Sequence, residues 1–160
     1  MNPISLRPLE ADDYAPIIQV LDEWWGGREM RDMLPKLFFA HFRDTSFIAE
    51  SSGERVGFLI GFLSQSFPSE AYIHFVGVHP HYRLAGVGRR LYEHFFQVVR
   101  AKGCDTVRCV TAPVNHNSIA FHLGMGFEIE AGATVTNGVP VYQNYDGAGE
   151  DRVLFVKRLS

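Results

Sequence analysis

Hydrophobic and polar side chains alternate along several short stretches, which is the pattern of strands with one buried face. Three of them are residues 4–9, 71–80 and 106–112. Residues 46–63 contain two such runs around a Ser-Gly-Glu turn and predict a hairpin. Two more strands are expected near residues 127–135 and 151–159, around a loop rich in Gly and Asn. The pattern therefore predicts about seven strands.

Elsewhere apolar side chains recur every three or four residues, the spacing of a helix with one buried face. The first helix runs from a capping aspartate, Asp12 or Asp13, to the glycine pair at residues 26–27. A second periodic stretch covers residues 30–42. A third helix ends at Gly103, and a short fourth one begins the segment 115–127, so about four helices are expected.

The order of these elements, β-α-α-β-β-β-α-β-α-β-β, is that of a mixed α/β fold. The βαβ segment 71–112 is expected to be parallel with a right-handed crossover. No repeat and no linker of low complexity divides the chain, so residues 1–160 are expected to form a single domain.

Composition narrows the class of protein. The chain has 160 residues, is 46% hydrophobic and carries a net charge of −3, without a basic block for nucleic acid. Its apolar runs are too short to span a membrane, and the absence of an apolar secretory segment predicts a cytoplasmic protein. Cys104 and Cys109 are expected to be reduced. The histidines and cysteines lack metal-ligand spacing, so no metal is expected.

The segment RLAGVGRRL at 83–91 lies between a predicted strand and a predicted helix. Leu91 occupies the third glycine position of a dinucleotide fingerprint, and Arg89-Arg90 replace the Lys-Ser/Thr pair of a P-loop. Unpaired amides at a helix start, next to glycines and three arginines, nevertheless favour an anion. A tight turn with solvated arginines is the alternative, and the loop alone does not decide between them.

Two motifs together resemble the GNAT superfamily of N-acetyltransferases. The pattern R-x-x-G-x-G follows a strand that ends in V-x-P at 78–80, and Asn115 precedes Gly126-Phe127 as in the family's second motif. The resemblance covers nearly the whole chain and implies a mixed sheet of about seven strands, splayed at strands 4 and 5. It also implies acetyl-CoA as co-substrate.

The resemblance implies which residues contact this co-substrate. The pantetheine arm would lie along the strand residues Val76, Gly77 and Val78. The diphosphate would be held by the loop residues Arg83, Leu84, Ala85, Gly86, Val87 and Gly88. Asn115 and Phe121 would reach the cofactor from the other side.

The catalytic pattern departs from the family at one position. His122 stands where many members place a tyrosine that protonates the leaving thiolate; packing without chemistry is the alternative. For the base, Tyr72 and His74 share a strand face with Val76 and Val78 and match the positions of histidines in arylalkylamine-type acetyltransferases. A structural histidine is the alternative for His74.

Four residues are candidates for contact with the acceptor, because the family places its pocket between the first two helices and the tail loop. These candidates are Trp25, Arg28, Tyr142 and Tyr145.

The resemblance predicts an N-acetyltransferase that acetylates a primary amine of a small molecule by direct attack in a ternary complex. A protein N-terminal or lysine acetyltransferase and a non-catalytic module that senses acyl-CoA are the alternatives. Dimers are frequent in the family, so a homodimer is one expectation; no nucleic-acid or membrane partner is expected.

Overall fold

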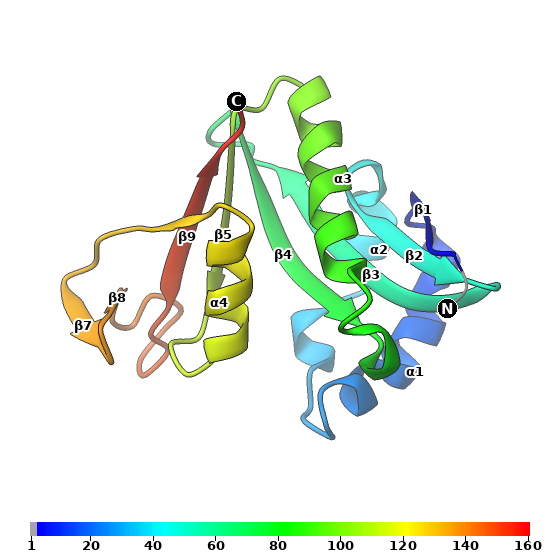
Figure 1. Ribbon diagram of the computed structural model, residues 1–160, viewed down its shortest axis with the longest axis horizontal. Coiled ribbons are helices and arrows are strands. Elements are labelled where there is room, and N and C mark those ends of the chain that lie inside the picture. Colours follow the sequence, from blue (N-terminus) through cyan, green and yellow to red (C-terminus); the bar gives the residue numbers. More distant parts are fainter. Residues whose placement is uncertain (1–2) are drawn as a thin grey trace. The chain divides into compact units, whose positions relative to one another are not determined.

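The computed structural model describes residues 3–160, which divide into two compact units. The first contains residues up to Leu63 and Ile73–Gly103, and the second contains Ser64–Tyr72 and Cys104–Ser160. Seven strands are hydrogen-bonded in the order β1-β2-β3-β4-β5-β9-β6, and Figure 1 labels all of them except β6. Strand β4 contributes residues to both units. The sequence predicts that residues 1–160 form a single domain. Because this expectation depends on how the two units are arranged, it stays a prediction.

In the first unit, antiparallel strands form the sheet, as the sequence pattern predicts. Strand β1 (Ser5–Pro8) pairs with β2 (Phe47–Ser51), and β2 pairs with β3 (Glu54–Leu63). The hairpin turn is Ser52-Gly53, with φ of 52° and 79°. Two successive positive φ angles give a turn whose twist matches that of the flanking strands. Next in the sheet is β4 (Glu70–Val78).

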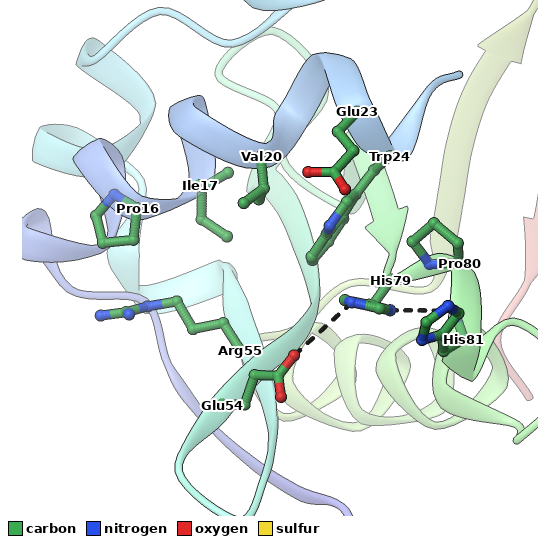
Figure 2. A pocket seen from close by; sticks show the side chains of 10 residues that line it. All are labelled: Pro16, Ile17, Val20, Glu23, Trp24, Glu54, Arg55, His79, Pro80 and His81. Carbon is green, nitrogen blue, oxygen red and sulfur yellow. Dashed lines mark hydrogen bonds and ion pairs between the residues drawn. The ribbon is translucent and has the colours of Figure 1, made fainter. Parts of the chain in front are cut away.

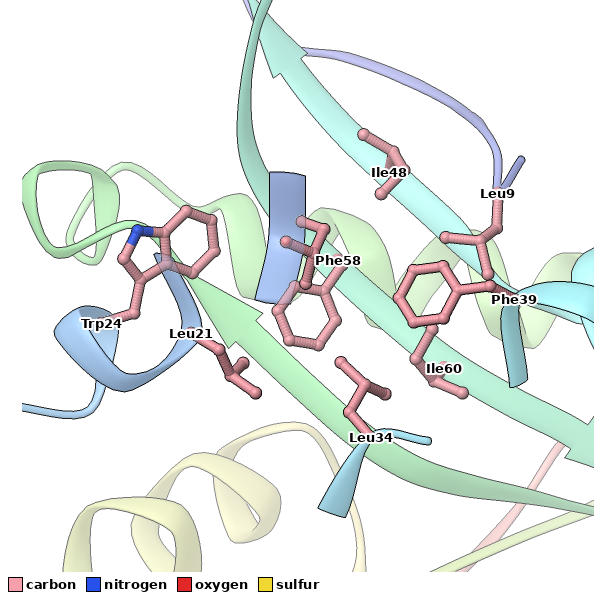
Figure 3. Close-up of a cluster of buried hydrophobic side chains, with 9 residues drawn as sticks. Leu9, Leu21, Trp24, Leu34, Phe39, Ile48, Phe58 and Ile60 are labelled. Atoms are coloured by element: carbon pink, nitrogen blue, oxygen red, sulfur yellow. The ribbon is translucent and has the colours of Figure 1, made fainter. Parts of the chain in front are cut away.

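Helices cover both faces of β3, because successive residues of a strand point to opposite faces. Phe58 packs with Leu21 and Trp24 of α1 (Tyr14–Trp24) in the buried cluster of Figure 3. The preceding residue, Gly57, faces α3 (Val87–Ala101): a Cβ atom there would lie 2.9 Å from Cγ1 of Val87. Fully burying a side chain such as Phe58 stabilises the fold by about 1.5–3 kcal/mol.

The continuous helix expected over residues 30–42 is wrong. A 3₁₀ turn, Arg31–Met33, precedes the short helix α2 (Leu37–His41), and a second turn, Arg43–Thr45, follows it. Pro35 explains the break, because a residue before proline is disfavoured in the helical region; Leu34 has φ −135° and ψ 62°.

The second unit is built around β5 (Thr106–Thr111), which confirms the predicted parallel pairing. Residues Glu70–Tyr72 of β4 pair in parallel with Thr106–Arg108 of β5. Strand β9 (Val153–Arg158) runs antiparallel to β5 and to the two-residue strand β6 (Glu128–Ile129). The helix of this unit is α4 (His116–Gly124).

The single strand expected over residues 127–135 is also wrong. After β6 the chain forms a separate hairpin of β7 (Thr134–Thr136) and β8 (Val139–Val141). Its turn is Asn137-Gly138, with φ of 51° and 80°. An Asn-Gly pair between two β-rich runs is a strong hairpin signal, and the sequence reading missed it.

Residues 3–160 contain four α-helices, in agreement with the predicted number. Within that range, no helix combines the length and the apolar character that crossing a membrane requires.

Candidate functional site

The glycine loop joins β4 to α3 and ends at Gly86, the residue that caps α3. Gly86 has a φ of +80°, a conformation that other residues rarely adopt, and a Cβ atom there would meet nothing within 4 Å. The first helical hydrogen bond runs from the Arg90 amide to the Gly86 carbonyl, at 3.1 Å. The amides of Val87, Gly88 and Arg89 therefore have no partner within the helix. These amides and the positive end of the helix dipole suit a phosphate, so this end of α3 fits the diphosphate of an acyl-CoA.

The three arginines of this loop bind the protein itself. Arg83 donates from Nε to the carbonyl oxygen of Val78 at 3.3 Å, and from a terminal nitrogen to the carbonyl of Trp24. Arg90 donates to the carbonyl of Ile4, and Arg89 pairs with Glu93 at 3.6 Å. Leu84 is fully exposed, and the Ala85 amide is bound to the Tyr82 carbonyl at 3.1 Å.

One face of β4 carries the predicted base. Ala71, Ile73 and Gly77 are buried on the opposite face, whereas Tyr72, His74, Val76 and Val78 are only half-buried. The prediction that these four side chains share a face is therefore consistent with the observed burial. Val76 and Val78 follow His74 toward the strand end that leads into the glycine loop.

His74 is held in a defined orientation. Its Nε2 lies 2.5 Å from the carbonyl oxygen of Met33, and its ring stacks on Phe38 with centroids 4.3 Å apart. A carbonyl only accepts, so Nε2 carries the proton and Nδ1 keeps the lone pair. Burial lowers the pKa of His74, although the Met33 carbonyl opposes this shift. The ring is therefore neutral at neutral pH and can accept a proton at Nδ1.

Trp25, a predicted acceptor residue, packs against β4. Its ring stacks on Phe75 with centroids 4.9 Å apart and contacts Phe58 at 6.5 Å. A Cβ atom at Gly77 would lie 2.5 Å from Cε1 of Phe58 and 2.9 Å from Cη2 of Trp25. This close approach explains the glycine in the strand. Arg28, by contrast, is exposed.

A pocket of about 490 Å³ lies between α1 and the residues just before the glycine loop (Figure 2). Trp24 forms part of its apolar wall. On the polar side, Nε2 of His79 lies 3.7 Å from Oε1 of Glu54, and Nδ1 accepts the His81 amide at 3.0 Å. The lining contains none of the residues predicted for catalysis, cofactor or acceptor. We therefore assign to this pocket neither the cofactor nor the acceptor of the predicted acetyl transfer.

In the second unit, Asn115 caps α4. Its side-chain oxygen accepts the amide of Ser118 at 3.2 Å, so the oxygen serves the helix and the amide nitrogen remains a donor. Phe121 is half-buried, and its ring meets that of His122 edge-on at 5.6 Å.

His122 is buried in an aromatic environment. Its ring stacks on Phe155 with centroids 4.6 Å apart, and Phe127 contacts it edge-on at 5.2 Å. Nδ1 donates to the carbonyl oxygen of Ser118 at 2.7 Å, and burial lowers the pKa of the ring. The proton of the neutral ring is therefore directed at the helix backbone, and Nε2 of that tautomer is an acceptor rather than a donor.

Tyr72 and the tail tyrosines also lie in the second unit. Burial raises the pKa of Tyr72, and Tyr145 and Cys109 add smaller contributions in the same direction. Tyr72 therefore keeps its proton at neutral pH and is a weak candidate for a base. The hydroxyl of Tyr142 donates to the Ala131 carbonyl at 2.7 Å, and its ring meets that of Tyr145 edge-on at 6.3 Å.

Sequence reasoning missed two residues that orient His74: Met33 and Phe38. Met33 acts through its backbone carbonyl, which carries no side-chain signature, and it lies 41 positions from His74. Across residues 3–160 no group of three or more His, Cys, Asp or Glu residues is arranged to hold a metal ion.

Comparison with known proteins identifies relatives of this chain. Residues 11–127 match the model of the Acetyltransferase (GNAT) family. A curated relative, an L-2,4-diaminobutyric acid acetyltransferase of Nocardia farcinica, is 32% identical over 84 residues. That match covers 52% of this chain and only 44% of the relative's length.

Two solved structures share the fold. A putative acetyltransferase of the GNAT family from Desulfovibrio desulfuricans superposes with a TM-score of 0.78 at 16% identity, covering 99% of this chain and 100% of that chain. Diaminobutyrate acetyltransferase EctA from Paenibacillus lautus, solved with its substrate and coenzyme A, gives 0.74 at 22% identity, with 98% and 95% covered. At these identities the likeness shows the fold alone.

Proposed function

Because the chain belongs to the acetyltransferase (GNAT) family, we propose that it transfers the acetyl group of acetyl-CoA to the primary amine of a small molecule that carries an apolar part. The orientation of His74 carries this proposal: a neutral imidazole with its lone pair on Nδ1, on the strand that leads into the glycine loop. The named relatives that act on diaminobutyrate support a small amine as acceptor.

The amine must lose a proton before it can attack, because an ammonium group has no lone pair. Nδ1 of His74 takes that proton, directly or through a water, while Met33 holds the other ring nitrogen in place. Acetyl-CoA supplies the acetyl group as a thioester. The backbone amide of Val78 donates to the oxygen that becomes negative as the amine adds to the carbonyl carbon.

Breakdown of this adduct releases the thiolate of coenzyme A, and the nitrogen loses its second proton to water, which gives the neutral amide. We assign no proton transfer to neutral His122, because its N–H is bound to the Ser118 carbonyl. Only the doubly protonated ring can donate from Nε2, and burial disfavours that form. The thiolate therefore takes its proton from water, and His122 packs the second unit.

The apolar side chains around His74 favour an acceptor amine that has an apolar part. Phe38 stacks on the His74 ring, and Val76 and Val78 share the strand face of His74. Within the first unit, the Phe38 ring and these two valines suit a flat or apolar amine better than a zwitterionic diamino acid. Tyr142 and Tyr145 remain proposed acceptor residues from the second unit.

Release of coenzyme A from acetyl-CoA, followed with a thiol reagent, tests the proposal. The panel contains 2-phenylethylamine, L-2,4-diaminobutyrate and a peptide with a free N-terminus and a lysine. We expect the highest kcat/KM with 2-phenylethylamine. Turnover of the peptide alone would replace the small-molecule proposal with a protein acetyltransferase. Tight binding of acetyl-CoA without turnover of any amine would indicate a sensing module.

A further inference from the structure

Arg83, the first residue of the R-x-x-G-x-G pattern, directs its guanidinium at two backbone carbonyls. Nε donates to Val78 at the end of β4, at 3.3 Å, and a terminal nitrogen donates to Trp24 at the end of α1. Within residues 3–160 no carboxylate lies at ion-pair distance from this side chain. One side chain thus joins the start of the glycine loop to the end of the first helix.

The position of the Trp24 carbonyl favours a hydrogen bond from a positively charged side chain. It belongs to the last turn of α1, whose carbonyls have no partner within the helix and carry partial negative charge. A guanidinium placed there satisfies a carbonyl and complements the helix dipole. The contact therefore defines where α1 ends relative to the glycine loop.

The end of α1 in turn positions the segment 25–33. Trp25 packs on Phe75 and closely approaches Gly77. The carboxylate of Asp22 in the last turn of α1 accepts the Met30 amide at 2.9 Å. Met33, three residues further, supplies the carbonyl that binds Nε2 of His74 at 2.5 Å. A shift of the last turn of α1 would consequently disturb both Trp25 and the orientation of His74.

We propose that Arg83 is a positioning residue that links occupancy of the glycine loop to the segment 25–33 beside the acceptor amine, rather than a direct partner of the diphosphate. This inference rests on the proposed function, because it takes the loop as the seat of coenzyme A. Arginine suits the role, since its planar fork can bond two carbonyls at once. A lysine keeps the charge but presents a single ammonium group on a flexible stem.

The substitutions Arg83→Lys and Arg83→Gln separate geometry from charge. Arg100→Gln, at an exposed position in the last turn of α3, is the control for loss of one positive charge. For each protein, calorimetry measures the Kd of coenzyme A, and hydrogen–deuterium exchange follows residues 24–33 with and without coenzyme A. Kinetics with 2-phenylethylamine measure KM and kcat separately.

In the wild type and in Arg100→Gln, we expect coenzyme A to slow exchange across residues 24–33. Arg83→Lys should bind coenzyme A with nearly wild-type affinity, lose this slowing, and raise the KM for the amine about fivefold or more. Arg83→Gln should show the same affinity for coenzyme A, the same loss of slowing and the same rise in KM as Arg83→Lys.

The opposite pattern would overturn the proposal: a Lys variant that behaves as wild type and a Gln variant that loses affinity for coenzyme A would assign Arg83 to the diphosphate. Unchanged exchange and unchanged KM in both variants would also overturn it. A wild-type protein that does not bind coenzyme A would instead refute the proposed function itself, and the two failures are therefore distinguishable.

Discussion

His74 and Met33 lie 41 positions apart in the chain, yet Nε2 of the histidine is 2.5 Å from the carbonyl oxygen of the methionine. This contact selects the tautomer with the proton on Nε2, so Nδ1 is the atom that can accept a proton. The fold, through a backbone group, therefore determines which nitrogen of the proposed base is available for chemistry.

His74→Ala should lower kcat/KM at pH 7.5 by about 10²-fold or more, because the amine then loses its base. His74 must be neutral to accept a proton, so the rate falls as pH drops through its pKa. Burial lowers this pKa, which places that limb below the ordinary histidine value of about 6.5. The limb should be absent in His74→Ala, whose activity should recover as rising pH supplies neutral amine.

His41→Ala, at an exposed position, is the control and should retain the wild-type pH profile. Overlaid profiles of His74→Ala and wild type would exclude His74 from the mechanism.

His122→Phe should leave kcat within about tenfold of wild type at pH 7.5, below the usual contribution of a general acid. Phenylalanine keeps the stack on Phe155 but cannot donate to the Ser118 carbonyl. Steady-state kinetics with saturating acetyl-CoA measure the effect. A loss of about 10²-fold or more, restored in His122→Tyr, would instead identify His122 as the proton donor, as in members with a tyrosine.

Stability should decrease when the pH is lowered from about 7.5 to 5.5. Folding lowers the pKa of both His74 and His122, so the unfolded chain binds more protons just below the ordinary value of about 6.5. Their contribution is complete above that value and declines as pH falls toward the lowered pKa. Urea unfolding at several pH values measures the slope, which should be shallower in His122→Phe. An equal slope in both proteins would contradict this assignment.

Gly88→Glu should abolish binding of coenzyme A in a folded protein, because a carboxylate in the first turn of α3 repels the diphosphate. Gly88 is the better site for this test, because Gly86 has a φ of +80° and any substitution there adds backbone strain. Gly86→Ala measures that strain alone. Calorimetry with coenzyme A and circular dichroism provide the readouts. Wild-type affinity in folded Gly88→Glu would show that the loop does not hold the diphosphate.

Gly77→Ala should destabilise the protein by about 1–3 kcal/mol, because the added methyl group overlaps the rings of Phe58 and Trp25. Gly124→Ala is the matched control. Gly124 lies at the end of α4, where an added Cβ atom would meet nothing within 4 Å. We therefore expect the free energy of unfolding to stay unchanged or to rise slightly. Denaturant unfolding compares the two, and tryptophan fluorescence should change only in Gly77→Ala. Equal stabilities would refute the close packing of Trp25.

Much of the fold and of the candidate site was predictable because the relevant signals are local. Alternation and helical spacing correctly predict most strands and the courses of three of the four α-helices in residues 3–160, and neighbouring residues alone mark the glycine loop. A local signal also accounts for the hairpin of β7 and β8: Asn137-Gly138 predicts its turn, whereas the alternation alone predicts one strand followed by a loop. The break near Pro35 has a comparable local cause.

The amino-acid sequence by itself thus determined the order of elements, the R-x-x-G-x-G loop and the family to which the chain belongs, because each depends on residues close together along the chain. Only the tertiary structure decided that Arg83 binds the carbonyl of Trp24, that Trp25 packs on Gly77, and that the proton of His74 is on Nε2. These contacts join distant segments through backbone carbonyls and ring packing. Every residue has a carbonyl, and this core contains many aromatic rings, so no pattern in the sequence marks which of them will meet.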